Sequence, residues 1–272
     1  MYVSAIVLHK GEEPALGGNK GICNIFFNHC NLQCEYCQNF QISCNSSPLQ
    51  HNKMSVQECH DKVVEILNDG CNVVGLVSPT PYVEQIIELV DMLHQHGHHP
   101  TIVYNTNSYD TVETIRKVHD IVDIYLPDYK YGSYDMAGQL SKADDYPDKA
   151  LDAIKEMVRQ KGTGLSFDDT GLAHSGVIVR HLVLPGRIEN SKSALLNIAM
   201  EISNKLHISL MTQYYPTYHA GMYEDMDRKV TQKEYEEVVD FMYSLGFEHG
   251  WLQDPESSDF YKPDFNTGQV FQ

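Results

Sequence analysis

The chain has 272 residues, of which 42% are hydrophobic and 21% are charged, and its formal net charge is −17 at pH 7. A chain of this length can fold as one large α/β unit with a substantial core. Its acidic balance repels nucleic-acid phosphates and anionic lipid, and no segment approaches the roughly 18 consecutive apolar residues of a membrane span. The N-terminal segment also lacks a basic leader with a cleavage site. We therefore expect a cytoplasmic protein that binds neither nucleic acid nor membrane.

Strand and helical patterns alternate along most of the chain. Ser55 and Glu58 form a capping-box signature before a helical run that Gly70 ends, and Thr231 and Glu234 open the last helix in the same way. Short apolar runs bounded by turn residues predict buried strands at 23–27, 72–77, 101–104, 121–126, 176–184 and 207–211. Helices are predicted at 55–70, 82–96, 111–118, from Pro147, at 192–205 and from Thr231.

Six strand–helix units in this order predict an α/β protein. They imply a parallel sheet with helices outside it, joined by right-handed crossovers. This number of units suits either an incomplete barrel or a doubly wound sheet. Both architectures place functional residues at the carboxyl ends of the strands.

Polar and turn-forming residues gather immediately after or near the ends of these predicted strands. In chain order they are Cys30, Cys34 and Cys37, then Ser78-Pro79-Thr80, Asn105-Thr106-Asn107, Asp128 and Lys130, Arg180 and His181, and Gln213-Tyr214-Tyr215-Pro216. Loops are polar in any protein, and that is a sufficient explanation for any single loop. A cysteine cluster and an interior charge pair among them favour one shared site.

The chain has seven cysteines, an odd number without an export signal, so clustered thiols indicate metal binding rather than disulfides. Cys30, Cys34 and Cys37 form a C-x₃-C-x₂-C loop that can wrap one face of a cubane cluster, with each thiolate on a separate iron. The fourth iron is then open for a substrate, whereas electron-transfer clusters usually have four protein ligands. Two alternatives remain. A zinc site would need a fourth ligand such as His29, Cys23 or Cys44, and a purely electron-transferring cluster would use Cys23 or Cys44.

The cysteine loop and the aromatic residue before its third cysteine resemble those of the radical S-adenosylmethionine (SAM) enzymes. In that superfamily the amine and carboxylate of SAM chelate the open iron. An electron from the reduced cluster cleaves the sulfonium C–S bond and releases methionine and a 5′-deoxyadenosyl radical. The resemblance implies a [4Fe–4S] cluster, SAM and a partial (β/α)₆ TIM-like barrel of the radical SAM type.

Within the superfamily the chain is most similar to the activating enzymes of glycyl-radical enzymes, typified by pyruvate formate-lyase activating enzyme, and to a group of short iron–sulfur proteins related to them. The resemblance runs from about residue 20 to 245, and it rests on FFNHCNLQCEYCQNFQIS, VSPTPY, YNTNSYD, DIYLPDYKY, RHLVLPG and LMTQYYP. A single radical SAM domain over 1–272, with N-terminal and C-terminal extensions of its core, is therefore expected.

The same resemblance implies roles for individual residues. Tyr36 would pack beside the adenine of SAM. Asp128 and Lys130 match the D-x-K motif beside SAM and the substrate, and Arg180 with Pro185-Gly186 matches the R…PG strand. Asp128, Lys130 and Arg180 are the expected catalytic residues, since Lys130 or Arg180 can donate charge-assisted hydrogen bonds to a carboxylate or ribose. A structural ion pair is the alternative.

Two departures from the activating enzymes affect the cofactor-binding and substrate ends. Those enzymes carry a Gly-Gly-Glu loop after the second strand, where this chain has Ser78-Pro79-Thr80, whose carbonyls and hydroxyls could still accept from the SAM amine. Asn105 and Gln213 are further predicted SAM contacts. After the sixth strand a P-Y-H segment is replaced by Gln213-Tyr-Tyr-Pro216, so a different substrate is plausible.

Other cysteines and tyrosines have simpler interpretations. Cys23 and Cys71 lie in or beside apolar strands and are expected to be small core residues. Cys44 could donate a hydrogen atom to a substrate radical, and Tyr214 and Tyr215 could contact substrate or line the barrel mouth. No second cysteine group follows Cys71, so auxiliary clusters are not expected.

The histidine-rich tract HQHGHH at 94–99 could bind a divalent metal. It lies at a helix end before a strand, on the face opposite the strand carboxyl ends. A solvated loop is the preferred interpretation.

The sequence therefore predicts a radical SAM enzyme with one [4Fe–4S] cluster held by Cys30, Cys34 and Cys37. The resemblance implies a one-electron donor such as flavodoxin or ferredoxin. The substrate is either a protein glycine or a small molecule or peptide residue altered by rearrangement, elimination or epimerisation. A non-enzymatic zinc-binding protein is the distant alternative.

Overall fold

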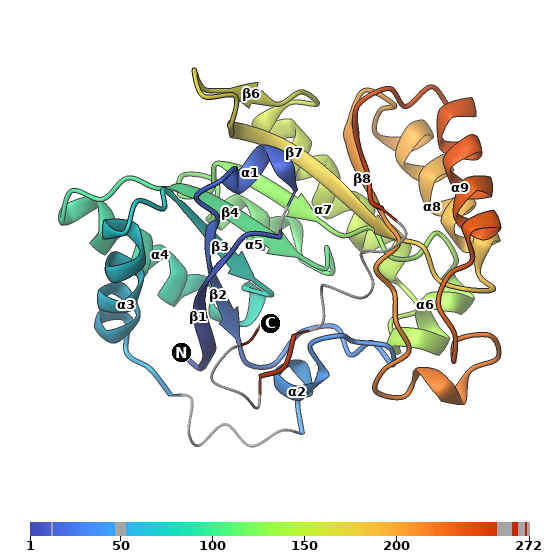
Figure 1. The fold of residues 1–272 in the computed structure, drawn as a ribbon, viewed down its shortest axis with the longest axis horizontal. Coiled ribbons are helices and arrows are strands. Elements are labelled where there is room, and N and C mark those ends of the chain that lie inside the picture. Colours follow the sequence, from blue (N-terminus) through green and yellow to red (C-terminus); the bar gives the residue numbers. More distant parts are fainter. Residues whose placement is uncertain (12, 47–52, 255–262, 266–269, 271–272) are drawn as a thin grey trace.

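The structure is a computed structural model that describes all residues except 12, 47–52, 255–262, 266–269 and 271–272 (Figure 1). Its strands are β1 (Val3–His9), β2 (Ile22–Phe27), β3 (Val73–Val77), β4 (Thr101–Thr106), β5 (Ile124–Pro127), β6 (Ser166–Phe167), β7 (Ala173–Leu182), β8 (His207–Met211) and β9 (Gly250–Leu252). Its α-helices are α1 (Pro14–Gly17), α2 (Phe40–Ser43), α3 (Val56–Asn68), α4 (Val83–Gln95), α5 (Val112–Lys117), α6 (Tyr134–Ser141), α7 (Tyr146–Lys161), α8 (Ile188–Glu201) and α9 (Gln232–Ser244). Two short 3₁₀ helices are η1 (Thr80–Tyr82) and η2 (Ala220–Met222).

The strands form one curved sheet in the order β1-β2-β3-β4-β5-β7-β8-β9, with β6 paired to β7. From β2 to β9 along this path every neighbouring pair is parallel, whereas β1 adds to β2 in antiparallel orientation. The order of the parallel strands never reverses, so the sheet lacks the switch point of a doubly wound fold. The predicted partial (β/α)₆ barrel is confirmed, and the doubly wound alternative is wrong.

Helices α3, α4, α5, α7, α8 and α9 surround the sheet, with α3 and α4 at one end of the curve and α8 and α9 at the other (Figure 1). All residues of β2 and β3 are buried, as expected for strands covered on both faces. Gly75 in β3 has a steric reason to be glycine, because a Cβ there would lie 2.0 Å from Asn24 Oδ1 of the neighbouring strand. Close packing of this kind fixes which side chains reach the carboxyl end of the sheet.

Both predicted capping boxes are present, at Ser55–Glu58 before α3 and at Thr231–Glu234 before α9. The helix predicted at 192–205 is displaced: it begins at Ile188, directly after the Pro185–Gly186 turn, and ends where the backbone of Ile202 leaves helical geometry. The strand predicted from 121 begins at 124 because the N–H groups of residues 121 and 122 both bond to the carbonyl of residue 118 and close a turn.

Several elements were not predicted. They include the edge strands β1 and β9 and the short helices α2 and α6. The hydrophobic periodicity of these segments is weak, and their positions depend on partners distant in the sequence. Strand β7 also begins three residues earlier than predicted, where it pairs with β6. Over the described residues, no helix has both the length and the apolar character needed to cross a membrane.

Candidate functional site

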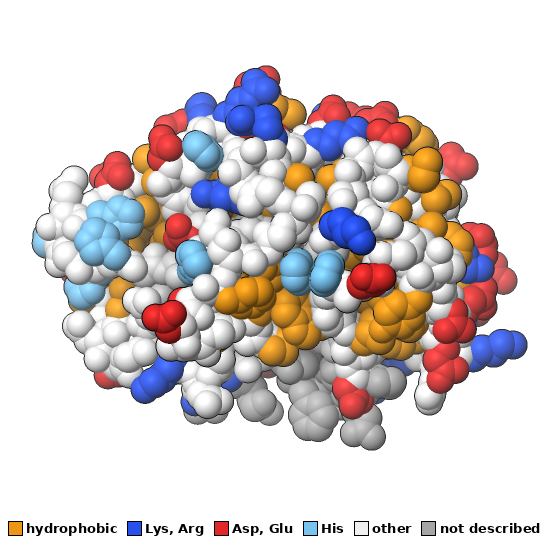
Figure 2. All heavy atoms as spheres, turned by 90° about the horizontal axis from the view of Figure 1, so that it is seen from above, with side chains coloured by type: hydrophobic (Ala, Val, Ile, Leu, Met, Phe, Trp, Pro, Cys, Tyr) orange, Lys and Arg blue, Asp and Glu red, His pale blue; other side chains and the backbone are white. Residues whose placement is uncertain are grey.

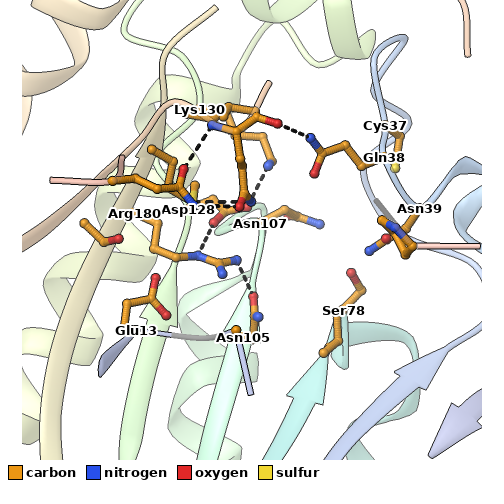
Figure 3. A pocket seen from close by; sticks show the side chains of 18 of the residues that line it. Glu13, Cys37, Gln38, Asn39, Ser78, Asn105, Asn107, Asp128, Lys130 and Arg180 are labelled. Atoms are coloured by element: carbon orange, nitrogen blue, oxygen red, sulfur yellow. Dashed lines mark hydrogen bonds and ion pairs between the residues drawn. The ribbon is translucent and has the colours of Figure 1, made fainter. Parts of the chain in front are cut away.

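A cavity of about 440 Å³ lies at the carboxyl ends of the parallel strands. Its described walls include the cysteine loop after β2, the loops after β3, β4 and β5, the carboxyl halves of β7 and β8, and β9 with the residues that follow it. The segment after β1 also contributes. Figure 3 shows Asp128 and Lys130, which follow β5, grouped with Arg180 of β7, with the cysteine loop across from them. The site that the sequence predicted from separate loops is therefore one cavity.

The three cysteines of the loop between β2 and α2 all line this cavity. Cys30 and Cys34 are buried, and Cys37 is partly exposed. Asn107 donates a hydrogen bond from Nδ2 to the Cys30 sulfur at 3.1 Å, and the Cys37 sulfur lies 3.1 Å from Ser43 Oγ. Hydrogen bonds to ligand sulfurs tune the reduction potential of a cluster. Asn107 and Ser43 are therefore positioned to tune the reduction potential of a bound cluster.

Burial raises the pKa of all three thiols. For Cys37, burial and then the neighbouring Cys34 raise the pKa to about 12. For Cys34 the burial effect is opposed by the positive charge of Lys130, and for Cys30 by the N–H of Leu32. Because the thiolate is the form that binds metal, iron binding here must displace protons.

The thiols do not surround a single point. Among the described residues, no group of three or more Cys, His, Asp or Glu side chains is arranged to hold one metal ion. A tetrahedral zinc site requires four ligands about 2.0–2.3 Å from the same ion. In a cubane cluster each cysteine binds a separate iron. Three thiols that line one cavity can each bind a separate iron.

Opposite the cysteine loop, one buried carboxylate binds two cations. Asp128 accepts from Lys130 Nζ at 2.6 Å and from Arg180 Nε at 2.8 Å, and the side chains of all three are less than a fifth exposed. Arg180 also donates from Nη2 to Asn105 Oδ1 at 2.7 Å. The contact follows from the sheet order, because Asp128 and Arg180 pair as a parallel bridge between neighbouring strands.

The charges of this group reinforce one another. Burial alone would raise the pKa of Asp128, but the charges of Arg180 and Lys130 outweigh it and lower that pKa below its usual range. Burial would lower the pKa of Lys130, yet the Asp128 carboxylate more than compensates and raises it. All three side chains are therefore charged at neutral pH. The triad itself carries one net positive charge, and its N–H groups can donate charge-assisted hydrogen bonds to an anionic group of a ligand.

Ser78 lies at the end of β3 in a left-handed conformation, with φ of 56°, a region that favours glycine. Its N–H donates to the carbonyl of Asn105 at 3.0 Å, and both residues line the cavity. Backbone strain is typical of ligand-binding loops. The Ser78 backbone therefore adopts a shape that a glycine-containing loop would adopt more easily.

Pro79 and Thr80 are not among the described residues that line the cavity. Thr80 Oγ1 instead donates to the buried Asp110 carboxylate at 2.7 Å, which also accepts from Thr106 Oγ1 at 2.5 Å. The prediction that Pro79 and Thr80 contact SAM therefore has no support in this geometry. Thr80 joins the loops after β3 and β4.

The remaining predicted contacts, Tyr36, Asn105 and Gln213, all line the cavity. The Tyr36 ring is buried and lies 6.4 Å from the Tyr131 ring and 6.2 Å from the Tyr214 ring, measured between centroids. These neighbours hold Tyr36 in the wall of the cavity. That it contacts adenine remains a prediction.

Sequence reasoning named Gln213 but missed Gln38 and Gln253, the two glutamines that bond to it across the cavity. Gln38 donates from Nε2 to the Gln213 carbonyl at 3.0 Å. Gln253 donates from Nε2 to Gln213 Oε1 at 2.8 Å and accepts at Oε1 from the Gln213 N–H at 2.9 Å. Gln38 directly follows Cys37, so its position was a usable signal. Nothing in the sequence pointed to Gln253, because β9 was not predicted.

The other candidate residues are placed away from the cavity. Cys44, Tyr214 and Tyr215 are not among its described lining residues. The Cys44 sulfur lies 2.9 Å from Ser46 Oγ, and the Tyr214 hydroxyl donates to the Met226 carbonyl at 2.7 Å. The hypothesis that Cys44 donates hydrogen to a substrate radical has no support here. Cys23 and Cys71 are buried in the core, as predicted.

A parallel partial barrel with a cysteine loop, a charged triad and amide side chains around one cavity defines a cofactor-binding α/β-barrel protein of the iron–sulfur class. The sequence profile of the radical SAM superfamily matches residues 24–172, which is more than half of the 272 residues. The chain belongs to the radical SAM superfamily.

The chain is similar to an uncharacterized protein of Methanocaldococcus jannaschii, with 29% identity over 248 residues, which cover 88% of this chain and 66% of that protein. Among solved structures it is similar to methylornithine synthase, with a TM-score of 0.57, 15% identity, and coverage of 82% of this chain and 62% of that one. It is also similar to the FeFe-hydrogenase maturase HydG from Carboxydothermus hydrogenoformans, with a TM-score of 0.56, 12% identity, and coverage of 85% and 53%. The chain thus spans about two-thirds or less of the length of each of these proteins. The two structural similarities show the fold alone.

Membership in the superfamily implies a [4Fe–4S] cluster and SAM as the cofactors. The residues present fit both. Cys30, Cys34 and Cys37 supply three thiols to one cavity, whose volume is within the usual range for small-molecule sites of about 300–1,000 Å³. Lys130 and Arg180 supply buried positive charge for a carboxylate.

Proposed function

We propose that this protein cleaves SAM reductively and uses the resulting radical to abstract hydrogen from a substrate held in the same cavity. The observation that carries the proposal is the shared cavity of the three cysteines and the Asp128–Lys130–Arg180 triad. When bound, the reduced cluster supplies the electron that breaks the sulfonium C–S bond, giving methionine and a 5′-deoxyadenosyl radical.

Within this proposal, the chain's own residues bind and orient the cofactors. Cys30, Cys34 and Cys37 hold the cluster and leave one iron without a protein ligand. Lys130 and Arg180 donate charge-assisted hydrogen bonds to the SAM carboxylate, and Asp128 keeps both cations in fixed positions through two hydrogen bonds of the same kind.

The reduction requires a one-electron donor, and we propose flavodoxin or ferredoxin for that role in a cytoplasmic setting. The choice of donor rests on the resemblance to the glycyl-radical activating enzymes, and reductive cleavage needs an electron from outside the chain. Assays with dithionite and with the protein donor should give the same SAM products.

The decisive test is an anaerobic assay of the reconstituted protein with dithionite and SAM, with 5′-deoxyadenosine and methionine measured by chromatography. We expect both products from the wild type and neither from Cys34→Ser. Cys71→Ser is the matched control, since Cys71 is also a buried cysteine but donates to the carbonyls of Gly21 and Val73 outside the cavity. Equal activity of the Cys34 and Cys71 variants would refute the proposal.

Two substrate classes are compatible with this chemistry. A protein glycine is suggested by the resemblance to the glycyl-radical activating enzymes in the cysteine loop and the D-x-K segment. A small molecule or peptide residue is favoured by a specific observation: Trp251, Gln253 and Asp254 from the β9 edge, together with Glu13 from the β1 side, line the same cavity. Walls from both sheet edges restrict the access of a large protein segment.

Label transfer separates the two classes. Candidate small molecules and peptides with deuterium at the reacting carbon should pass deuterium into 5′-deoxyadenosine if they are substrates. Formation of a glycyl-radical electron paramagnetic resonance signal in a partner protein, with no transfer from small molecules, would establish the activating function instead.

A further inference from the structure

A pair of histidines lies between α3 and α4, away from the cavity. His60 of α3 is buried, with 6% of its surface exposed, and its ring centroid is 4.7 Å from that of His96, at an interplanar angle of 56°. His96 is the C-terminal capping residue of α4 and is exposed. Figure 2 shows histidine side chains gathered on the molecular surface at this end.

The hydrogen bonds of His60 determine which ring nitrogen is available. Its Nδ1 lies 2.9 Å from Asp61 Oδ1, a carboxylate that can only accept when ionised, so Nδ1 carries the proton of the neutral ring. Nε2 then holds a lone pair. That atom is buried, and it has no hydrogen-bond partner among the residues that the structure describes. A buried polar atom of this kind requires an explanation.

His96 has the same arrangement. Its Nδ1 lies 2.9 Å from the carbonyl of Met92, which is an acceptor, so Nδ1 donates and Nε2 holds the lone pair. A carboxylate or carbonyl on the outer nitrogen is what metal-binding histidines usually have, because it fixes the tautomer and the orientation of the ring. Both members of the pair are therefore fixed in the form that binds metal.

We infer that His60 and His96 bind one divalent transition-metal ion, of the class of Zn²⁺, Ni²⁺ or Cu²⁺, through their Nε2 atoms. Imidazole nitrogen suits these ions. With a metal–nitrogen distance of about 2.0–2.1 Å, the ring centre lies about 3.2 Å from the ion, so two rings on adjacent coordination positions are about 4.5–5.2 Å apart. The observed 4.7 Å is within this range.

The site would have two protein ligands, since no set of three or more ligating side chains is preassembled in the described part of the chain. It would join α3 to the end of α4. This inference is independent of the proposed SAM chemistry, because neither histidine lines the cavity.

The test uses untagged, cluster-reconstituted protein under anaerobic conditions, so that the cavity thiols are already occupied, and NiCl₂ as the probe in isothermal titration calorimetry. We expect one Ni²⁺ per chain, and at least tenfold weaker binding in His60→Gln and in His96→Gln. Asp61→Asn should also weaken binding, by about tenfold or more, because it loosens the orientation of the His60 ring. Because His60 is buried, the fold of His60→Gln is checked by circular dichroism. If His60→Gln does not fold, His96→Gln still tests the inference, because His96 is exposed.

His119→Gln is the matched control. His119 has the same arrangement with the next residue, its Nδ1 lying 3.3 Å from Asp120 Oδ1, but no second histidine ring in the described residues contacts it. Its affinity for Ni²⁺ should be unchanged. The inference is overturned if the wild type binds no Ni²⁺ or if His96→Gln leaves the affinity intact. It is also overturned if binding is lost only in the double variant His94→Gln/His99→Gln, whose rings stack at 4.8 Å.

Discussion

At the scale of single residues, Asp128 holds the two cations of the site together. It is the only described carboxylate that contacts both Lys130 and Arg180, and it holds them at 2.6 and 2.8 Å in a poorly exposed position. A buried carboxylate with two cationic partners is difficult to replace, because removing it leaves two charges without their counter-ion.

We expect Asp128→Asn to destabilise the fold by about 3 kcal/mol, since breaking a buried ion pair on one side leaves uncompensated charge. SAM cleavage should fall strongly, because Lys130 and Arg180 lose the group that orients them. The measurements are chemical denaturation and the 5′-deoxyadenosine assay. Asp120→Asn is the control, because the Asp120 side chain is 96% exposed. A variant as stable and active as the wild type would show that the triad is dispensable.

His181, which is not a cluster ligand, makes the stability of the fold depend on pH. It is fully buried, with Nδ1 at 2.6 Å from the Tyr129 carbonyl and Nε2 at 2.9 Å from Ser191 Oγ. Burial lowers its pKa to about 4, from 6.5 for an exposed histidine. The folded protein therefore resists protonation that the unfolded chain accepts.

The stabilisation from neutral His181 should be fully present above about pH 6.5 and be lost as the pH falls towards 4, in total about 3 kcal/mol. Replacement by Asn removes this titration. We expect the difference in unfolding free energy between the wild type and His181→Asn to change by about 3 kcal/mol between pH 7 and pH 4, measured by urea denaturation. A difference that stays constant over this range would contradict the lowered pKa.

At the scale of elements, the loops after β3 and β4 are joined by one buried residue. Asp110 follows β4 and accepts from the hydroxyls of Thr80 and Thr106. The N–H of Ser108 also bonds to Thr106 Oγ1 at 3.1 Å. These contacts position Ser78 and Asn107, which line the cavity from the same two loops.

Asp110→Ala should cost about 2 kcal/mol of stability, because the buried Thr106 hydroxyl and the half-buried Thr80 hydroxyl lose their acceptor. Its larger effect should be a several-fold weaker affinity for SAM, with the cluster content unchanged, since no cysteine ligand contacts Asp110 directly in the described contacts. Equilibrium dialysis with SAM and iron analysis separate the two effects. A loss of iron together with SAM affinity would place Asp110 in the cluster site instead.

At the scale of the whole molecule, the cavity depends on contacts between opposite ends of the sheet. Gln38 from the cysteine loop, Gln213 after β8 and Gln253 after β9 form a continuous chain of hydrogen bonds. This chain connects the first parallel strand of the barrel with the last. It narrows the side of the barrel that the seven parallel strands from β2 to β9 leave open.

We expect Gln253→Ala to uncouple SAM cleavage from substrate turnover, because the Gln213 side of the wall loses its support and water gains access. The 5′-deoxyadenosine formed without substrate should rise relative to the wild type, while the cluster content stays the same. Gln232→Ala is the control, since Gln232 bonds to Glu236 on the exposed face of α9. An unchanged background rate would show that the glutamine chain does not affect coupling.

The cluster loop and the barrel core were predictable from the sequence because their signals are local. The spacing of Cys30, Cys34 and Cys37 is set within eight residues, and buried strands such as β3 are continuous apolar runs. The post-strand positions of Ser78, Asn105 and Asp128 follow from the same pattern, and all three line the cavity.

What the sequence by itself determined was therefore the fold class, the cluster cysteines and the charged residues at the strand ends. Only the tertiary structure decided that Thr80 turns away to Asp110, that Gln253 closes the cavity and that His60 faces His96. The physical reason is the range of the interactions. Periodicity and capping act over a few neighbours, whereas a side chain's partner is fixed by packing between segments that may be forty or more residues apart, as with Gln213 and Gln253.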